Sequence, residues 1–458
     1  MERLNNRWLI VFASVFGLLV GNGPVMQFTF GTLMPAVSRE FGWSRGTVSS
    51  AMVIGLWMTA LATPVLGGLV DRFGIRAIVL PAIVLFSLAT ISVAFVPASP
   101  VAFTALYALM GLGAAGQTPL IYAKAISARF DEQRGIALGI AMAGVGLGAT
   151  LVPQFVQASI GIVGWRGAYA ALGTLIFLLA FPAVSLFVGR PLPVPTNAGQ
   201  RVRTTELAGL TGFEALRTSQ FWLLAVSFFI VSGTTGGVIS HLVPLLTDRG
   251  VSLQNATHML SIAGLALIGG RLFAGYLLDR IHASLVAATF FSAPMIGIAA
   301  LVSTPRPDVA ALGTILIGIG LGAEVDLIAF LLSRYFGMRA FGEIYGFFFA
   351  IFILGAGLGP LAMGAWFDKA GSYTLMLVIF ALVLALSIVL VLRLGAYRYP
   401  ARRRVEQQTA VALSSGNESR TGLSLRNAVQ LRIIHLLLRA STSRPVSPRA
   451  HRELNSLT

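Results

Sequence analysis

The sequence predicts an all-α membrane protein with twelve transmembrane helices in two pseudo-symmetric six-helix bundles. The 458-residue chain is 56% hydrophobic and only 11% charged, whereas soluble domains carry roughly 25% charged residues. Its apolar segments are about 20 residues long or longer, enough to cross a hydrocarbon core of ~30 Å. The third observation is an internal repeat that relates the two halves of the chain.

Twelve apolar segments qualify as membrane spans. The first follows Arg3 and Arg7 and is too long for the apolar core of a signal peptide, so we expect an uncleaved span. The expected spans are 8–33, 47–70, 75–96, 101–127, 136–160, 167–189, 220–246, 256–278, 284–303, 309–332, 342–366 and 373–393.

The net charge of +16 is explained mainly by membrane topology. With both termini in the cytoplasm, the inner segments hold 25 of the 33 Lys and Arg residues and the outer loops hold six. Without the residues from Arg393 onward the inner count is still 13, in agreement with the positive-inside rule. We expect a multi-pass protein of the bacterial inner membrane with cytoplasmic termini, in contact with the lipid bilayer and not with nucleic acid.

The internal repeat extends over more than a hundred residues. The segment GLGATLVP, which begins at Gly146, resembles ILGAGLGP, which begins at Ile353, at an offset of 207. Parallel repeats of this kind build transporters whose substrate site lies between the halves near the bilayer midplane. At an offset of 208 the matching pairs are Gly42 and Gly250, Ser44 and Ser252, Gly67 and Gly275, Asp71 and Asp279, and Arg72 and Arg280.

The repeat also sets the expected domain boundaries. Residues 1–189 are predicted to form the N-terminal six-helix bundle and residues 220–395 the C-terminal bundle. The Pro-rich basic stretch 190–219 between them is predicted to be a cytoplasmic linker. Residues 396–458 are rich in Arg and Ser and are predicted to be a disordered cytoplasmic tail.

The loop between the second and third spans has the pattern G-x3-D-R-x-G-x-R, and a degenerate copy follows the eighth span. Glycine permits close helix approach, and an Asp at a helix end can cap backbone amides of a neighbouring helix. The pattern resembles the signature loop of the major facilitator superfamily, in which such contacts hold the cytoplasmic gate. The resemblance assigns this gating role to Gly67, Asp71, Arg72, Gly74, Arg76, Asp279 and Arg280.

Three further segments resemble the oxalate/formate exchanger and monocarboxylate carrier branches of that superfamily. They are EFGWSRGTVS from Glu40, RGIALGIAMAGVGLG from Arg134 and GWRGAY from Gly164. The fifth span lacks the Gly-Pro pattern of drug/proton antiporters, which argues against drug efflux. The second cation of the exchanger, a Lys in the eleventh span, is absent here, which favours monoanions over dicarboxylates.

Arg271 is the strongest single candidate for substrate binding. It lies eight residues from the end of the eighth span, hence about 12 Å deep, and a guanidinium offers a planar fork to a carboxylate. The resembled anion carriers place a substrate-binding Arg in this span. The alternative is a structural ion pair with Asp326 or Glu324.

Glu324 and Asp326 are acids inside the tenth span, where each would be costly without a partner. Two residues correspond to about 200° around a helix, so the side chains cannot face one point. One is expected to address the cavity or Arg271, and the other a neighbouring helix. A carboxyl group shielded from water can carry a proton, and the alternative is a fixed salt bridge.

Four other residues are candidates for substrate binding, each with a structural alternative. Lys124 lies five residues from Arg129 and can instead snorkel to the cytoplasmic surface. The other three lie on helices that line the cavity in the resembled family, and the alternative for them is an interhelical hydrogen bond. They are His241, Gln117 and Tyr122.

These features together predict a secondary active transporter that moves a small, monocarboxylate-like organic anion by alternating access, with proton symport or anion exchange. The alternative is a carrier or efflux pump of the same fold for neutral or cationic small molecules. We expect a functional monomer without cofactor or metal. An enzyme is not expected, because no nucleophile–base cluster, phosphate loop or metal-ligand spacing occurs.

Overall fold

The computed structural model describes residues 8–127, 130, 134–187, 209–278, 280–303, 306–337 and 339–399. These residues are almost entirely helical, and the β-structure among them is a single bridge between Gly209 and Gly337. The elements are α1 Trp8–Leu19, η2 Gly23–Phe28, α2 Phe30–Phe41, α3 Arg45–Phe73, α4 Ile75–Ser92, η3 Val93–Phe95, α5 Pro100–Ala114, η4 Ala115–Gln117, α6 Pro119–Ser127, α7 Arg134–Phe187, α8 Gly212–Leu216, α9 Ser219–Thr247, α10 Leu253–Leu278, α11 Ala283–Ser303, α12 Pro307–Tyr335, α13 Phe341–Ala370 and α14 Thr374–Leu392.

Eleven segments among the described residues are long and apolar enough to cross a membrane. One of them, within α7, is 52 residues long and contains a non-helical residue, Gly164, with φ 70° and ψ 176°. Since a single span needs only about 20 residues, α7 contributes two spans that are joined by a sharp turn. The described helices therefore account for the twelve predicted spans, and the predicted all-α membrane fold is confirmed.

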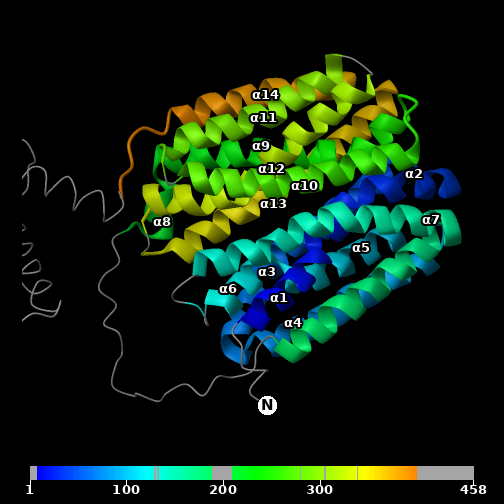
Figure 1. Cartoon of the computed structure of the whole chain (residues 1–458), viewed down its shortest axis with the longest axis horizontal. Coiled ribbons are helices and arrows are strands. Elements are labelled where there is room, and N and C mark those ends of the chain that lie inside the picture. Colours follow the sequence, from blue (N-terminus) through cyan, green and yellow to red (C-terminus); the bar gives the residue numbers. More distant parts are fainter. Residues whose placement is uncertain are drawn as a thin grey trace, which may run out of the picture. The chain divides into compact units, whose positions relative to one another are not determined.

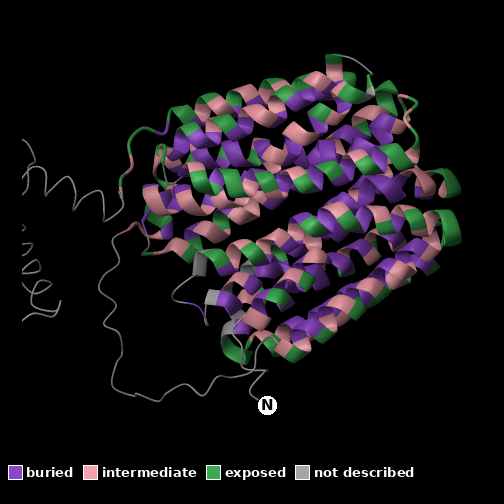
Figure 2. Cartoon of the chain, viewed as in Figure 1, coloured by how far each residue is buried: buried purple, intermediate pink, exposed green. Residues whose placement is uncertain are grey.

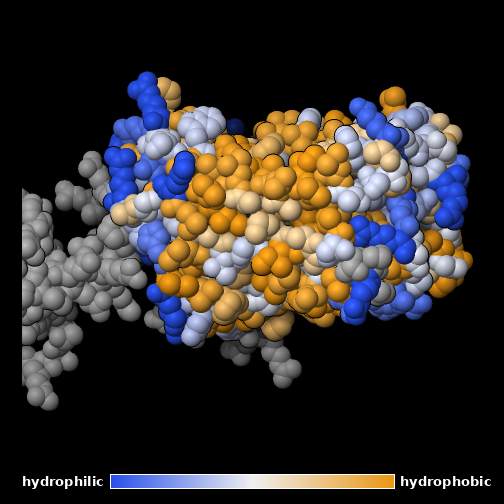
Figure 3. Space-filling view, turned by 90° about the horizontal axis from the view of Figure 1, so that it is seen from above, coloured by the Kyte–Doolittle hydropathy of each residue, from blue (hydrophilic) through white to orange (hydrophobic). Residues whose placement is uncertain are grey.

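The surface has the two-zone pattern of a multi-pass membrane protein. On the face seen in Figure 3, hydrophobic side chains form a broad belt across the middle of the helices, and hydrophilic side chains gather toward both ends. Inside the belt, the helix faces that point toward one another are buried (Figure 2). Helices can carry such a lipid-facing belt because their backbone N–H and C=O groups are hydrogen-bonded within each helix and need no water.

The two ends of the bundle are distinguished by the order of the helices. At the linker end α1 begins, α7 ends, α9 begins and α14 ends, and we call the opposite end the distal end (Figure 1). We use N-terminal half for α1 to α7 and C-terminal half for α9 to α14.

Glycine turns at the distal end repeat between the halves. Gly42 and Gly250, 208 positions apart, have φ 66° and 85°. Gly164 and Gly371, 207 positions apart, have φ 70° and 64°. Because a positive φ is strained for residues with a β-carbon, the offset places a glycine with positive φ at an equivalent position in both halves. The second pair differs in ψ, which is 176° at Gly164 and 10° at Gly371.

The halves touch mainly along α3 with α13 and α7 with α10, and also where α9 meets α2 and η2. Along α3, the contacts run from Arg45, whose carbonyl lies against Gly364, to Trp57, whose indole lies against Gly357. Further toward the linker end, the α3 residues Leu61 and Val65 are 71% and 62% exposed. The contact between α3 and α13 therefore belongs to the distal part of the bundle.

The described part of the predicted 190–219 linker begins at Gly209 and contains the short helix α8. α8 begins with a capping box in which Thr211 accepts from the Glu214 amide and the Glu214 carboxylate accepts from the Thr211 amide. It packs against the start of α13. Residues 190–208 of the linker lie outside the described residues, and the proposed boundaries at 189 and 220 stay a prediction.

The predicted tail, 396–458, begins with four described residues that pack on the C-terminal half. The ring of Tyr397 stacks on His282 at 4.0 Å, and its hydroxyl accepts a hydrogen bond from the Ala283 amide. The Tyr399 amide donates to the Arg334 carbonyl. The rest of the predicted disordered tail, residues 400–458, lies outside the described residues.

Candidate substrate site

Arg271 on α10 and Asp326 on α12 form an ion pair inside the bundle. The Arg271 Nε donates to Asp326 Oδ2 at 2.9 Å, and Arg271 Nη1 donates to the Met142 carbonyl of α7 at 3.2 Å. The Arg271 side chain is 13% exposed and that of Asp326 is 37% exposed. The pair is therefore held at the contact between the halves, with part of the carboxylate accessible.

Glu324 points away from this pair. It is 2% exposed, and its Oε1 accepts a hydrogen bond of 2.9 Å from Thr235 Oγ1 on α9. Asp326 faces α10, so the two acids have different neighbours, as their spacing on α12 predicts. Asp326 meets a cation, whereas the described contact of Glu324 is with a neutral hydroxyl.

Two membrane helices of the N-terminal half are interrupted in mid-course. α1 continues after Asn22 as the π-helical turn η2, and α5 is separated from α6 by the 3-10 turn η4. Gln117 ends η4 and is fully buried, and neither its amide oxygen nor its nitrogen has a hydrogen-bond partner among the described residues. The same holds for the Tyr122 hydroxyl and the Asn22 Oδ1. Unpaired buried polar atoms at broken helices are typical of ligand sites.

The interrupted α1 helix and the Arg271 pair lie at neighbouring levels along α7. Gly23 lies against Val145, which is three residues after Met142, the residue that Arg271 contacts. Three helical residues correspond to about 4.5 Å. The N-terminal half thus contributes neutral polar groups, and the C-terminal half a cation, at almost the same depth.

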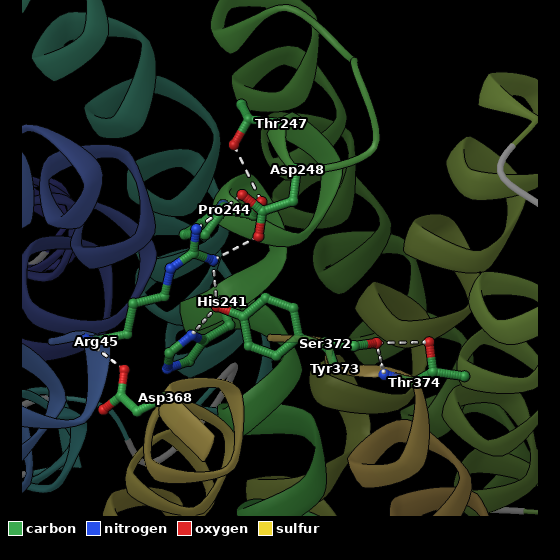
Figure 4. Close-up of polar contacts among 9 residues, drawn as sticks. All are labelled: Arg45, His241, Pro244, Thr247, Asp248, Asp368, Ser372, Tyr373 and Thr374. Carbon is green, nitrogen blue, oxygen red and sulfur yellow. Dashed lines mark hydrogen bonds and ion pairs between the residues drawn. The ribbon is translucent and has the colours of Figure 1, made fainter. Parts of the chain in front are cut away.

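His241 is not brought to the Arg271 pair. It is fully buried on α9, six residues and hence about 9 Å beyond Thr235, the partner of Glu324. Its Nδ1 lies 3.0 Å from the Tyr373 hydroxyl near the distal end (Figure 4). Its Nε2 contacts Ser49 Oγ and the Pro360 carbonyl. The structure therefore places this predicted substrate ligand in a separate network, and its predicted role stays untested.

The predicted gating loop after α3 is at the linker end. Gly74, with φ 87°, ends α3 and its amide donates to the Val70 carbonyl. Arg72 and Arg76 are exposed, and Gly67 has open space where a β-carbon would be. The side chain of Asp71 lies outside the described residues, so the cap that it was predicted to form is not tested.

The second copy of the loop and the cation of the fourth span are only partly described. The guanidinium of Arg280 lies 3.7 Å above the Tyr276 ring. Asp279 and the side chain of Lys124 lie outside the described residues. The roles predicted for these three residues stay predictions.

Two of the motifs singled out in the sequence meet at the distal end of the N-terminal half. Glu40, from EFGW, accepts hydrogen bonds from the Trp165 indole at 2.5 Å and from Arg166 Nε and Nη2 at 3.0 and 2.9 Å. Arg166 Nη1 also donates to the carbonyls of Ala94 and Val96. These bonds hold the pKa of the Glu40 carboxyl below its ordinary value, with the Trp165 bond the largest cause. We call this cluster of Glu40, Trp165 and Arg166 the distal clasp. The sequence motifs that contain these residues did not predict that they would meet.

The twelve spans, the duplicated glycine turns and the signature loop predict one superfamily, and comparison with known families decides it. Residues 8–351 match the sequence profile of the Major Facilitator Superfamily. The chain belongs to this superfamily. The relationship suggested by the signature loop is thereby confirmed.

Major facilitator relatives with 27–28% identity carry carboxylate transporter names. The chain is 27% identical to monocarboxylate transporter 11 of Homo sapiens over 80% of this chain and 78% of that protein. It is 28% identical to the oxalate:formate antiporter of Oxalobacter formigenes over 78% of this chain and 85% of that protein. Both fall within the branches suggested by the motifs.

A solved structure shows the same fold at low sequence identity. It is a bacterial homologue of the human lysosomal transporter Spinster in an inward-facing and occupied conformation. The TM-score is 0.62 at 17% identity, and the match covers 84% of this chain and 96% of that one. This similarity supports the fold alone.

Proposed function

We propose that this major facilitator protein is a secondary active transporter for small organic anions with one carboxylate. Substrate binds at Arg271 and crosses the membrane by alternating access of the two halves. Transport is coupled to proton symport or to exchange with a second anion.

The observation that carries the proposal is the Arg271–Asp326 pair. Its Nε–Oδ2 bond is only one of the contacts that a planar guanidinium can give a carboxylate. A substrate carboxylate can replace Asp326 on Arg271 without leaving the arginine uncompensated. Because Asp326 is 37% exposed, it can turn to water when this exchange occurs.

Neutral groups on the opposite half favour a small substrate with one charge. Gln117 and Tyr122 supply two amide donors, an amide oxygen and a hydroxyl that no described protein group satisfies. The eleventh span, in α13, carries its charges near its ends, at Glu343, Asp368 and Lys369, and none between residues 344 and 367. A second carboxylate would therefore lack a matching cation along that helix, in line with the monocarboxylate name of one relative.

The proposal includes the membrane orientation and assembly. The excess of Lys and Arg at the linker end supports cytoplasmic termini, and we place the protein in the bacterial inner membrane as a functional monomer. Under this orientation the distal end faces outward. The 190–219 linker and the 396–458 tail are cytoplasmic.

A carrier of neutral or cationic compounds is the competing function. In that case Asp326 is the charge partner of the substrate, and Arg271 is its resting counter-ion. The two functions differ in which member of the pair the substrate needs.

Counterflow in proteoliposomes separates these functions. Vesicles preloaded with unlabelled formate, acetate, pyruvate or lactate should accumulate the labelled anion faster than empty vesicles, because a carrier is stimulated from the opposite side. The matched control is the charge-balanced variant Arg271→Gln/Asp326→Asn. Flux without trans-stimulation would indicate a channel, and stimulation by cations alone would indicate the competing carrier.

A further inference from the structure

We propose that Arg45 and Asp248 form a lock that closes the distal end of the transporter and must open in every transport cycle. The proposal rests on the proposed alternating-access function. It concerns conformation, however, and its test needs no substrate.

The internal repeat shows why Asp248 needs a partner from the other half. At the 208 offset, Asp248 is the counterpart of Glu40, and at the 207 offset Tyr373 is the counterpart of Arg166. In the N-terminal half, Glu40 pairs with Arg166 of its own half at 2.9 Å. In the C-terminal half that position holds a neutral tyrosine, so Asp248 lacks the equivalent cation.

Arg45 from the N-terminal half takes the place of this missing cation. Its Nη1 and Nη2 donate to the two carboxylate oxygens of Asp248, each at 2.7 Å (Figure 4). Nη1 also donates to the Tyr373 hydroxyl at 2.6 Å, and the guanidinium lies 3.8 Å above the Phe367 ring. Bidentate arginine–carboxylate pairs are the strong, geometrically specific kind. The clasp therefore joins elements within one half, whereas the Arg45–Asp248 pair exists only while the halves meet.

Backbone contacts add to the same closure. Asp368, near the end of α13, accepts from the backbone amide of Arg45 at 2.9 Å (Figure 4). It also accepts from the backbone amide of Gly46 at 2.7 Å. These amides are at the start of α3, where the first N–H groups have no partner within their own helix. A residue of the C-terminal half thus caps a helix of the N-terminal half. Separation of the distal ends breaks this cap together with the ion pair.

His241 extends the lock into the bundle through a directed chain of hydrogen bonds. Its Nε2 lies 3.0 Å from the Pro360 carbonyl, which only accepts, so Nε2 carries the proton. Nδ1 then accepts from the Tyr373 hydroxyl at 3.0 Å, and Tyr373 in turn accepts from Arg45. Nε2 also lies 3.1 Å from Ser49 Oγ of the N-terminal half. His241 is therefore a positioning residue that holds Tyr373 toward Arg45.

A buried serine beside the lock provides a reporter of its opening. Ser240 is fully buried, its hydroxyl has no partner among the described residues, and its carbonyl lies against Gly31 of the N-terminal half. The chain contains no cysteine, so Ser240→Cys introduces a single thiol of similar size. In lipid nanodiscs, its rate of labelling by a water-soluble maleimide measures how often the distal contact opens. Ser261→Cys, which reports from the contact of α10 with Thr150, is the second reporter if the first variant folds poorly.

The lock predicts a specific order of labelling rates. Arg45→Gln and Asp248→Asn should each raise the rate roughly tenfold, and the double variant should not exceed the larger single effect by much, because both remove one interaction. The matched control Glu40→Gln, which opens the clasp within one half, should leave the rate unchanged. Equal rates in Arg45→Gln and Glu40→Gln, or independent additive effects of Arg45 and Asp248, would overturn the lock. If Arg45→Gln and Asp248→Asn raise the labelling rate as predicted but the protein shows no organic-anion counterflow, the lock stands and only the proposed substrate is rejected.

Discussion

Asp326 pairs with Arg271 across 2.9 Å, whereas Glu324, one half-turn away on the same helix, accepts from the Thr235 hydroxyl. One acid of α12 is thus neutralised by a cation, and the other is buried against a neutral group. Burying a carboxylate without a cation is costly in a membrane. From this difference we expect different tasks for the two acids: Asp326 should compete with substrate for Arg271, and Glu324 should carry a proton.

Replacing the two acids separately tests this division. Glu324→Gln should remove the dependence of anion uptake on external pH while homo-exchange of the anion continues, because an amide cannot release a proton. Asp326→Asn should keep the pH dependence. The measurement is the initial rate of uptake and of exchange in proteoliposomes across a pH series. An unchanged pH profile in both variants would mean that protons are not coupled through α12.

Removing the Tyr122 hydroxyl should weaken substrate binding and leave stability intact. That hydroxyl has no partner among the described residues, so Tyr122→Phe removes no described hydrogen bond. If the hydroxyl binds substrate as proposed, the variant should raise KM roughly 2- to 10-fold. The matched control is Tyr107→Phe, because the Tyr107 hydroxyl lies 2.7 Å from that of Tyr169. The control should lose about 0.5–1.5 kcal/mol of stability with KM unchanged. A loss of stability without a change in KM in Tyr122→Phe would show that the Tyr122 hydroxyl has a structural role.

The distal clasp should stabilise the protein in a pH-dependent way. Hydrogen bonds from Trp165 and Arg166 lower the pKa of Glu40, so its stabilisation is present above the unfolded-state pKa and is lost as pH falls through the lower folded-state value. Glu40→Gln should therefore lower Tm at neutral pH, and the difference from the unchanged protein should shrink below about pH 4. Thermal unfolding in detergent at several pH values measures this. A Tm difference that does not vary with pH would show that the charge of Glu40 is not what matters.

The turn at Gly164 should tolerate no side chain, although space is available. A β-carbon there meets nothing within 4 Å, but φ is 70° and ψ is 176°, a region that is essentially restricted to glycine, so Gly164→Ala should cost roughly 1–3 kcal/mol. Gly161, three residues earlier in α7, also has open space and no positive φ, and Gly161→Ala should be neutral or stabilising by up to about 1 kcal/mol. The melting temperatures of Gly164→Ala and Gly161→Ala, measured under the same conditions, test whether the backbone conformation at Gly164 requires glycine. Equal effects of both substitutions would refute the backbone argument.

Much of the fold could be predicted from the sequence because the membrane imposes it. Spans of about 20 apolar residues predict the twelve helices, and the 208 offset pairs Gly42 with Gly250, both of which have a positive φ. The 200° between Glu324 and Asp326 was also sufficient to predict different neighbours. These inferences depend only on the length of the apolar segments, the offset of the repeat and the periodicity of the α-helix, all of which can be taken from a single sequence.

The distal contacts could not be predicted in the same way. In the sequence Arg45 is only one of the six basic residues of the expected outer loops, because its partner Asp248 is 203 positions away and the pairing depends on how the halves meet. A usable signal did exist: in the repeat, Glu40 and Asp248 correspond, whereas Arg166 corresponds to Tyr373. A missing cation in one copy of a repeat therefore indicates a partner elsewhere.

Binding of short carboxylates to the purified protein shows directly whether Arg271 holds the substrate carboxylate. The measurement is the Tm shift produced by lactate or acetate, each compared with its neutral amide, in the unchanged protein, Asp326→Asn and Arg271→Gln/Asp326→Asn. A ligand that binds only the folded protein raises Tm by mass action. We predict that Asp326→Asn responds to the carboxylates at least as strongly as the unchanged protein and that the double variant does not respond. An equal response of the double variant would contradict the account.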